Sequence, residues 1–344
     1  MPELRRDPVL GYWTIISTER SRRPMEFKPR RLDTDAPECP FCEGHERQTP
    51  GEVYALRPDG SAPDGPGWRT RVFLSKVPIL PVGEHVQRYG QGLYDVMEGA
   101  GRHEIIVECP DHKSGLDSLE TPQIESVIRS WAARINAFEK DPLFTFAFLF
   151  ANHGLIFGSP SDVVRHSRSQ MVAMPITPKR VKEELLAAKI YFERRDRCVF
   201  CDIVRQESAD KSRMVAENDS FLAFCPFASR SPFEIWVMPR RHSPDFGSID
   251  EKEAPAFAAI LKDCLGRLRT LLDDPSYNSI LHTAPYRHKK RETHWKTIEE
   301  DYHWYFQISP RLTQSAGFEW GTGIHINPTP PEDAALLLRE VKRG

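Results

Sequence analysis

A chain of 344 residues and 39.5 kDa, 40% of them hydrophobic, is long enough to form one large domain or two of ordinary size. Its 47 basic and 49 acidic residues give a formal net charge of -2, which excludes a general attraction to nucleic acid or to an anionic membrane. No apolar run approaches the roughly 18 residues of a membrane-spanning helix, and the N-terminal residues lack the apolar core of a signal peptide. We therefore expect a cytoplasmic protein with no nucleic-acid or membrane partner, which holds any anion through local groups.

The first half of the chain begins with a cysteine pair and an expected strand. Cys39-Pro-Phe-Cys42 is the first of two CxxC pairs among seven cysteines. In a reducing compartment, two such pairs favour metal binding over disulfides. Residues 57–70 are rich in Gly and Pro and predict a surface loop. Residues 103–112, HEIIVECPDH, alternate as a strand does and end on a histidine.

A long helix, another strand and a His-x-x-x-Gln pattern follow. Residues 121–142 have apolar side chains at helical spacing, with Thr121 as the expected N-cap and Pro122 at the first helical position. Residues 144–152, FTFAFLFAN, predict an apolar strand. Residues 166–170 read HSRSQ, a histidine followed four residues later by glutamine.

The second half repeats these features in the same order, after a charged amphipathic helix expected over residues 178–197. Each half has a CxxC pair, a strand in which a glutamate (Glu104, Glu234) precedes a histidine by eight residues, a long helix, an apolar strand and His-x-x-x-Gln. Such an ordered repeat makes chance a poor explanation. In the second half the features occupy residues 198–201, 233–242, 250–275, 278–284 and 303–307.

The repeat predicts an α+β fold with two modules in tandem, residues 1–180 and 181–344. Each module is expected to be a mostly antiparallel sheet with a long helix packed on one face. The helix at residues 178–197 is expected to join the two modules. The second long helix is expected to begin at Asp250 or a neighbour.

Each half also offers four residues suited to one structural zinc ion. Zinc prefers a tetrahedron of thiolate and imidazole ligands, and a CxxC turn supplies two thiolates; four protein ligands leave no open position, which argues against a metallohydrolase. Long gaps between the ligands and the balanced charge argue against a zinc-ribbon nucleic-acid binder. The alternative is that these residues are buried thiols and hydrogen-bonded core histidines. The expected ligands are Cys39, Cys42, His112 and His166 in the first half, and Cys198, Cys201, His242 and His303 in the second.

These motifs resemble the galactose-1-phosphate uridylyltransferase family, a branch of the histidine-triad superfamily whose members carry two histidine-triad-like modules in one chain. The resemblance spans nearly the whole sequence and includes HEIIVECPDH, CVFCDIV, HWYFQISPRL and GFEWGTGIHINPTPPEDAA. It implies a homodimer and a ping-pong transfer, in which UDP-glucose gives its uridylyl group to a histidine and a second hexose 1-phosphate then takes it. The implied partners are thus a nucleotide sugar and a sugar 1-phosphate. Members with a cysteine-type second zinc site include plant enzymes acting on ADP-linked substrates, so the base stays open.

The resemblance also implies which residues contact the substrate. Guanidinium groups suit phosphate oxygens, and a Gly- and Ser-rich turn supplies donors around a reacting phosphate. The alternative for Arg20 or Arg23 is a solvated surface arginine, and the alternative for Gln170 is an ordinary glutamine on the surface of a strand. Ser75 and Lys76 fall beside the nucleotide, Phe318 and Glu319 match a sugar-side segment, and His325 falls near a position that is glutamine in some members. The implied phosphate-side residues are Arg20, Arg23, Asn152, Gly158, Ser159, Ser161 and Gln170.

Position 168 departs from the family pattern His-x-His-x-Gln, in which the first histidine binds zinc and the second is the nucleophile. Here the stretch reads His166-Ser-Arg168-Ser-Gln170. A neutral imidazole attacks phosphorus and then leaves readily, whereas a guanidinium stays protonated and has no free lone pair. The loss of the histidine argues against the ordinary reaction.

Four hypotheses stay open. Arg168 stabilises charge while the acceptor attacks the donor nucleotide directly; His153 supplies the nucleophile; the chain binds a nucleotide sugar without turnover; or water or phosphate is the acceptor. We expect a nucleotidyltransferase resembling UDP-glucose:hexose-1-phosphate uridylyltransferase, with Arg168 and Gln170 at the reacting phosphate. The alternatives are an inactive nucleotide-sugar-binding protein and a nucleotide-sugar phosphorylase or hydrolase. In the second half Tyr305 stands at the equivalent position and is expected to be a packed strand aromatic.

Overall fold

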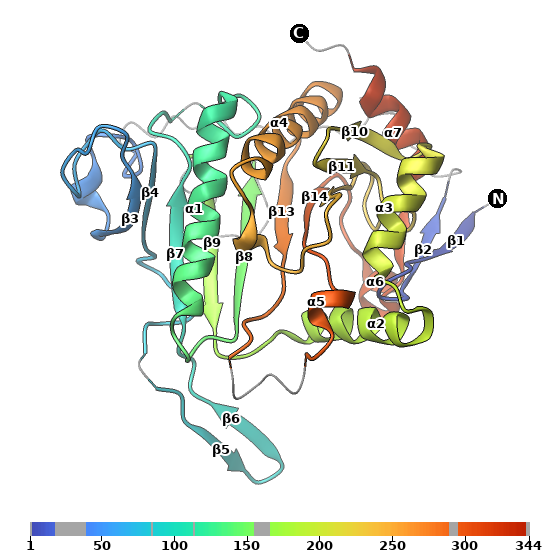
Figure 1. Cartoon of the computed structure of the whole chain (residues 1–344), viewed down its shortest axis with the longest axis horizontal. Coiled ribbons are helices and arrows are strands. Elements are labelled where there is room, and N and C mark those ends of the chain that lie inside the picture. The colour runs from blue at the N-terminus through green and yellow to red at the C-terminus, as the bar shows by residue number, and fades with distance from the viewer. Residues whose placement is uncertain are drawn as a thin grey trace.

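A ten-stranded sheet forms the centre of the protein (Figure 1). The computed structural model describes residues 2–17, 39–83, 85–112, 114–154, 166–288 and 295–341. Neighbouring strands in this sheet are antiparallel throughout. From edge to edge the strands are β10 (Met214–Glu217), β11 (Phe221–Phe224), β12 (Ile235–Pro239), β14 (Tyr305–Pro310), β13 (Tyr277–His282), β8 (Phe146–His153), β9 (Arg168–Met174), β7 (Arg102–Val107), β4 (Thr70–Leu74) and β3 (Glu52–Leu56).

The two halves of the chain each contribute one side of this sheet. They join where β8 pairs with β13, with Asn152 opposite Asn278. One long helix from each half, α1 (Thr121–Glu139) and α4 (Glu253–Leu272), lies on the same face of the sheet, and the two helices contact each other (Figure 1). The predicted α+β fold, with two repeated modules of sheet and long helix, is confirmed.

The starts of the two long helices show what the sequence could and could not specify. The carbonyl of Glu120 accepts the first helical hydrogen bonds, so the N-cap of α1 is Glu120, one residue before the expected Thr121. At α4 the side chain of Asp250 accepts hydrogen bonds from the N–H groups of Lys252 and Glu253, at 2.8 and 2.7 Å. Asp250 therefore stabilises the start of α4, as its position suggested.

The main core lies between the sheet and these two helices and is shared by both halves. Trp131 of α1 stacks on Phe306 of β14, with 5.7 Å between ring centroids. Phe246 and Phe257 pack edge-on against Trp304 in the same layer. Full burial of one such aromatic side chain stabilises the fold by about 1.5–3 kcal/mol. Because these rings come from both modules, neither module has a complete core without the other.

The other face of the sheet is covered unequally. On the second module, side chains of α2 and α3 pack against Trp236 and Tyr305 to form a second buried cluster. On the first module Phe148 and Phe150 stack on each other at 5.4 Å and stay half-buried. The sheet face around β8 and β9 is therefore the more accessible one. The covering helices are α2 (Lys179–Arg195), α3 (Val199–Asp210) and α5 (Ile298–Asp301).

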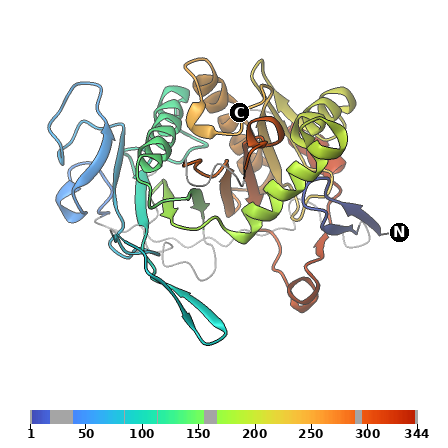
Figure 2. The ribbon, with the colours of Figure 1, turned by 60° about the horizontal axis from the view of Figure 1, so that its bottom comes forward.

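Several smaller elements lie at the periphery (Figure 2). The first two strands pair with each other, and β2 also pairs with β15 near the C-terminus, which places residues 3–16 beside the second module. Arg5 reinforces this arrangement through an ion pair of 2.9 Å with Glu332. A two-stranded hairpin extends away from the first module (Figure 2). These elements are β1 (Glu3–Arg6), β2 (Trp13–Ile16), β15 (His325–Asn327), β5 (Arg88–Gln91), β6 (Tyr94–Met97), α6 (Gly317–Thr322), α7 (Pro331–Glu340) and the 3-10 helix Glu46–Gln48. A second 3-10 helix, Phe246–Ser248, lies against the main core, where Phe246 is fully buried.

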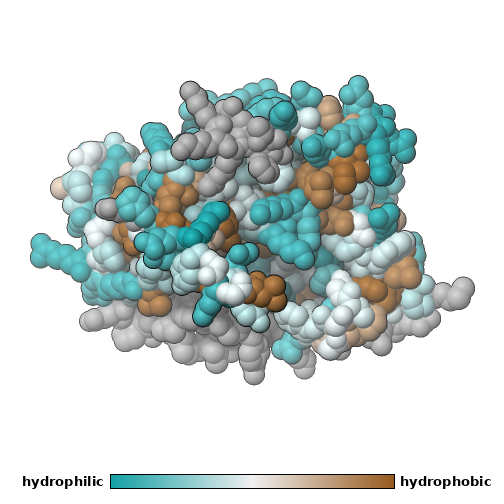
Figure 3. Space-filling view, turned by 90° about the horizontal axis from the view of Figure 1, so that it is seen from below, coloured by the Kyte–Doolittle hydropathy of each residue, from teal (hydrophilic) through white to brown (hydrophobic). Residues whose placement is uncertain are grey.

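Within the described part of the chain, no helix combines the length and the hydropathy needed to cross a membrane. Seen from below, apolar side chains form separate patches among polar ones (Figure 3). The buried apolar side chains form clusters on the two faces of the sheet.

Arg134→Met should lower the free energy of unfolding by about 3 kcal/mol or more, because it leaves a buried carboxylate without its partner. Arg134 on α1 donates two hydrogen bonds to Glu104 of β7, at 2.7 and 2.8 Å, and the Glu104 side chain is fully buried. Urea unfolding measures the change.

Arg129→Met, on the same helix, is the matched control. Its partners Glu125 and Glu251 lie nearer the solvent, so the expected loss is within about 1 kcal/mol. Adding Glu104→Leu to Arg134→Met should recover most of the lost stability. Equal losses in the two single arginine variants would show that the Glu104 pair is not specially important.

Candidate functional site

Strand β9 has two faces with different chemistry. Ser169 points toward α1, where its hydroxyl accepts a hydrogen bond of 2.7 Å from the Trp131 indole N–H. Since side chains alternate along a strand, Arg168 and Gln170 point to the opposite face, where Arg168 is partly exposed and Gln170 is 8% exposed. The two residues expected at a reacting phosphate therefore share one face of one strand.

His103 of β7 is hydrogen-bonded to Gln170. Its Nε2 lies 3.0 Å from Gln170 Oε1, and its Nδ1 accepts the backbone N–H of Ile79 at 3.2 Å. The ring is only 4% exposed, and this burial lowers the pKa of His103 below its ordinary value. His103 is therefore a neutral imidazole with both nitrogens engaged. Sequence reasoning did not single it out, because a histidine in an alternating strand gives no signal of its own.

Arg168 lies between this strand face and the first cysteine–histidine cluster. Its Nη1 donates to the backbone carbonyl of His166 at 3.2 Å. The guanidinium carbon lies 5.8 Å from the ring centroid of Phe41, within the CxxC turn, a cation–π distance. The turn that brings the cysteines together thus also supports the arginine.

Asn152 belongs to the same face of the sheet, and a residue of the second module fixes it. The Asn278 side-chain NH2 donates to Asn152 Oδ1 at 2.7 Å. Asn278 was not predicted, although aligning the two apolar strands of the repeat as antiparallel partners would have placed it opposite Asn152. This face of the first module therefore includes a side chain from the second.

His153 points away from Arg168. Its ring stacks on Tyr277 at 4.6 Å, and its Nε2 lies 2.8 Å from Asp274 Oδ1. Being adjacent to Asn152 in a strand, it faces the side of the sheet that carries α1. His153 is thus not placed where a substitute nucleophile would have to be.

The other substrate residues expected from the resemblance are only partly assembled. Ser75 follows β4 beside His103, whose carbonyl accepts its N–H at 2.8 Å, whereas Lys76 turns to the carbonyl of Gln48 at 2.5 Å. Phe318 and Glu319 lie on α6 of the second module, away from β9 (Figures 1 and 2). The expectations for Arg20, Arg23, Gly158, Ser159 and Ser161 fall outside the described residues.

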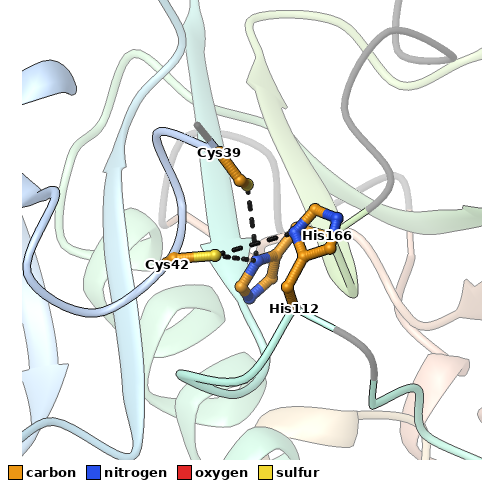
Figure 4. Close-up of side chains that lie close together, drawn as sticks. All are labelled: Cys39, Cys42, His112 and His166. Carbon is orange, nitrogen blue, oxygen red and sulfur yellow. Dashed lines mark hydrogen bonds between the residues drawn. The ribbon is translucent and has the colours of Figure 1, made fainter. Parts of the chain in front are cut away.

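The first expected metal-ligand set is brought together by the fold (Figure 4). One atom from each of Cys39, Cys42, His112 and His166 lies within 4.8 Å of the others. His166 turns Nδ1 to the two sulfurs, at 3.6 and 3.7 Å, and its Nε2 donates to the carbonyl of Cys109 at 2.7 Å. Burial lowers the pKa of His166 to about 4, which keeps the imidazole neutral, as a metal ligand must be.

The second set is assembled in the same way in the other module. One atom from each of Cys198, Cys201, His242 and His303 lies within 4.8 Å of the others. His303 Nε2 lies 2.9 Å from the carbonyl of Pro239, the counterpart of the His166 contact. The hydrogen bond from Cys198, with those from both histidines, lowers the pKa of Cys201 to about 3. Two sulfurs and two nitrogens at these separations match the donor set of a tetrahedral zinc site.

The repeated strands differ by one residue of register, which the sequence spacing concealed. Ile105 stands opposite Gln170, whereas Trp236 stands opposite Gln307. Glu104 consequently points to α1 and binds Arg134, while Glu234 points to the other face and accepts a 2.8 Å hydrogen bond from Gln307. The two glutamates share a spacing to histidine but not a face of the sheet.

In the second module the equivalent of the Arg168 face is filled by aromatic rings. Tyr305 lies between Trp236 and His282, with centroid distances of 4.5 and 4.1 Å, and is 2% exposed. The prediction that Tyr305 is a packed strand aromatic is confirmed. Among the described residues, the first module therefore has a polar pair, Arg168 and Gln170, where the second has packed rings.

Comparisons with known proteins agree with this arrangement. The N-terminal domain of galactose-1-phosphate uridyl transferase matches residues 78–167, and its C-terminal domain matches residues 184–339. The chain belongs to the galactose-1-phosphate uridylyltransferase family.

Its relatives carry more than one activity in their names. ADP-glucose phosphorylase of Arabidopsis thaliana is 33% identical over 345 residues, which cover 99% of this chain and 93% of the relative. Galactose-1-phosphate uridylyltransferase of Thermotoga maritima is 27% identical over 349 residues, covering 99% of each chain. A crystal structure of an Arabidopsis thaliana ADP-glucose phosphorylase with bound ADP-glucose has a TM-score of 0.82 at 31% identity, covering 100% of both chains.

A buried carboxyl group lies beside the strand that carries Arg168. Glu108 is 1% exposed and accepts a hydrogen bond of 2.5 Å from the Ser167 hydroxyl. Burial raises the pKa of Glu108 to about 7, although Ser167, Ser169 and the charge of Arg168 act in the opposite direction. Glu108 therefore keeps its proton up to near-neutral pH.

Glu108→Gln should flatten the pH dependence of stability between about pH 4.5 and pH 7. A folded-state pKa above the unfolded one gives stability that is complete below the unfolded pKa and is lost as pH rises through the folded pKa. Relative to the variant, the wild type should lose at most about 3 kcal/mol across this window. Urea unfolding at several pH values measures it, with Glu300→Gln, at an exposed side chain, as the control for charge loss. Parallel curves for the wild type and Glu108→Gln would contradict the protonated state.

Proposed function

We propose that this protein binds a nucleotide sugar and transfers its nucleoside monophosphate directly to a phosphate-bearing acceptor. The observation that carries the proposal is the placement of Arg168, which is partly exposed, and Gln170, which is 8% exposed, together on the face of β9 opposite α1. Both side chains donate hydrogen bonds, and Arg168 is permanently charged, which suits the charge that builds on a phosphoryl group under attack.

The residues that surround this pair support direct transfer. Arginine has no lone pair for attack, His153 faces the other side of the sheet, and His103 has both nitrogens engaged. A reaction without a covalent enzyme intermediate needs none of these imidazoles. The chain then acts by holding donor and acceptor in line and by stabilising the transferring group.

The names of the relatives support inorganic phosphate as the acceptor. An oxygen of inorganic phosphate attacks the phosphorus next to the nucleoside, and the bond from that phosphorus to the sugar-phosphate oxygen breaks. The bonding electrons leave with the sugar 1-phosphate, and the products are a nucleoside diphosphate and a sugar 1-phosphate. The 33% identity to an ADP-glucose phosphorylase supports phosphate as acceptor, while a sugar 1-phosphate gives the transferase reaction of other relatives.

We also propose a homodimer as the working form. Phe318 and Glu319 lie on α6, which carries a strongly exposed Trp320, 82% accessible, on the second module. Within one chain α6 lies away from β9, the strand of Arg168 (Figures 1 and 2). A second copy that covers the accessible face of β9 with its own α6 would bring the sugar-side and phosphate-side residues together.

Zinc is proposed for both cysteine–histidine clusters. Two thiolates and two imidazoles from separate elements leave no position for substrate, so each ion would hold a CxxC turn against the sheet. At the first cluster this fixes Phe41, and with it the surface under Arg168. The role is structural and the phosphate chemistry belongs to the strand face.

Arg168→Ala should weaken binding of the nucleotide sugar by about tenfold to a hundredfold and abolish turnover, because it removes a charged donor. The assay incubates the protein with UDP-glucose or ADP-glucose, with inorganic phosphate or galactose 1-phosphate, and follows products and intact protein mass. Arg168→Lys keeps the charge and should retain partial binding.

The mass measurement separates the mechanisms. Wild type should form product without gaining a nucleotidyl mass, whereas Arg168→His, which restores the imidazole, is expected to become nucleotidylated. A nucleotidylated wild type would contradict direct transfer, and unaltered turnover in Arg168→Ala would remove Arg168 from the site. Tight binding without any product would indicate a nucleotide-sugar-binding protein instead.

Metal content tests the clusters. Wild type should contain two zinc ions per chain, and Cys39→Ser with Cys42→Ser, or Cys198→Ser with Cys201→Ser, should each lose one. Mass spectrometry of the metal measures this, with Cys264→Ala, a core cysteine outside both clusters, as control. Full zinc in either double variant would show that its cluster is not the site.

A further inference from the structure

The hydrogen bonds of His103 determine which group of the Gln170 side-chain amide, the oxygen or the NH2, points away from His103. The Ile79 N–H donates to His103 Nδ1 at 3.2 Å, so this nitrogen carries no proton. Nε2 therefore holds the ring proton and donates it to Gln170 Oε1, 3.0 Å away. None of the described residues accepts a hydrogen bond from the Gln170 NH2 group, which keeps two donors for another partner.

The second module shows the opposite orientation of the equivalent glutamine. Glu234 occupies the strand position of His103, two residues before the partner of the glutamine in β12. Gln307 therefore donates its NH2 group inward, to Glu234 at 2.8 Å and Ser309 at 3.0 Å, and turns Oε1 to His282 at 3.0 Å. When the residue at this strand position is a hydrogen-bond donor, as His103 is, the NH2 group of the glutamine points away from it. When that residue is an acceptor, as Glu234 is, the NH2 group points toward it.

We propose that His103 is a positioning residue that presents the Gln170 amide as a donor to a phosphoryl oxygen of the substrate. Phosphoryl oxygens only accept hydrogen bonds, so the reversed amide would set two oxygens against each other. The inference rests on the proposed function, since it needs a phosphoryl group at this face.

The surroundings hold His103 in this role. The N–H of Ser75 donates to the His103 carbonyl at 2.8 Å, which fixes the backbone, and the Ile79 N–H fixes the ring. A protonated ring would place an N–H at Nδ1 against the N–H of Ile79. The neutral form with the proton on Nε2 is therefore the one that fits.

The test is His103→Glu, which copies the second module and should reverse the Gln170 amide. The probe is whichever of UDP-glucose and ADP-glucose the wild type binds, with the matching nucleoside as a ligand that lacks phosphate. His103→Glu should weaken nucleotide-sugar binding about tenfold or more and leave nucleoside binding unchanged, since only the former bears the phosphoryl oxygens. His103→Gln keeps a donor and should stay within about threefold of the wild type.

A double-mutant cycle identifies the route of the effect. If His103 acts through Gln170, His103→Glu should add no further loss in a Gln170→Ala background. Equal losses in both backgrounds would show that His103 acts by another route, and thermal unfolding of each variant confirms that it is folded. Nitrogen-15 NMR of the full-length wild type should show the ring proton on Nε2, and a proton on Nδ1 would overturn the proposal directly.

The possible failures are distinguishable. If the wild type binds neither nucleotide sugar although the ring proton of His103 is on Nε2, the proposed function is overturned. The role of His103 is then overturned as well. Normal wild-type binding that His103→Glu leaves unchanged overturns only the role of His103.

Discussion

The antiparallel pairing of β8 with β13 is the interaction on which the rest of the structure depends. It joins two five-stranded sheets into one and removes the open edge that each would otherwise expose. It also sets α1 beside α4, so that Trp131 of one module stacks on Phe306 of the other. Near one end of the same seam Asn278 holds Asn152, and a polar contact of the candidate site thus depends on the junction between the modules.

The alternation of side chains along β9 then separates structure from chemistry. One face supplies Ser169 to the core, and the other supplies Arg168 and Gln170 to a surface that the second module lacks. In the second module Tyr305 fills the corresponding space between two rings. Both modules nevertheless keep a cysteine–histidine cluster whose histidine is oriented by a backbone carbonyl. The two modules therefore share the sheet, the long helix and the cysteine–histidine cluster, and they differ at Arg168, which is partly exposed, and Tyr305, which is 2% exposed.

The repeat in the sequence was sufficient to predict the two sheets, the two long helices and both cysteine–histidine clusters. Those features depend on local periodicity and on ligand chemistry, which a sequence displays directly. The faces of Glu104 and Glu234 could not be predicted, because strand register is set by pairing with β9 and β14 and not by distance to a histidine. The same holds for residues 3–16, which pair with a strand from the far end of the chain. The role of His103 could not be predicted either, because it depends on the residues that its ring contacts in the folded protein.

The shared core also bears on how such a chain can change over time. Two fused copies that bury one another's aromatic side chains resemble a twofold dimer whose subunits are permanently tethered, at a very high effective concentration. Neither copy is free to lose its packing residues, since the loss would unfold its neighbour as well. Each copy is free to lose its reactive groups, because the other can carry them. A fused pair of this kind keeps its shared packing while the two copies diverge elsewhere, as Arg168 and Tyr305 do at equivalent positions of β9 and β14.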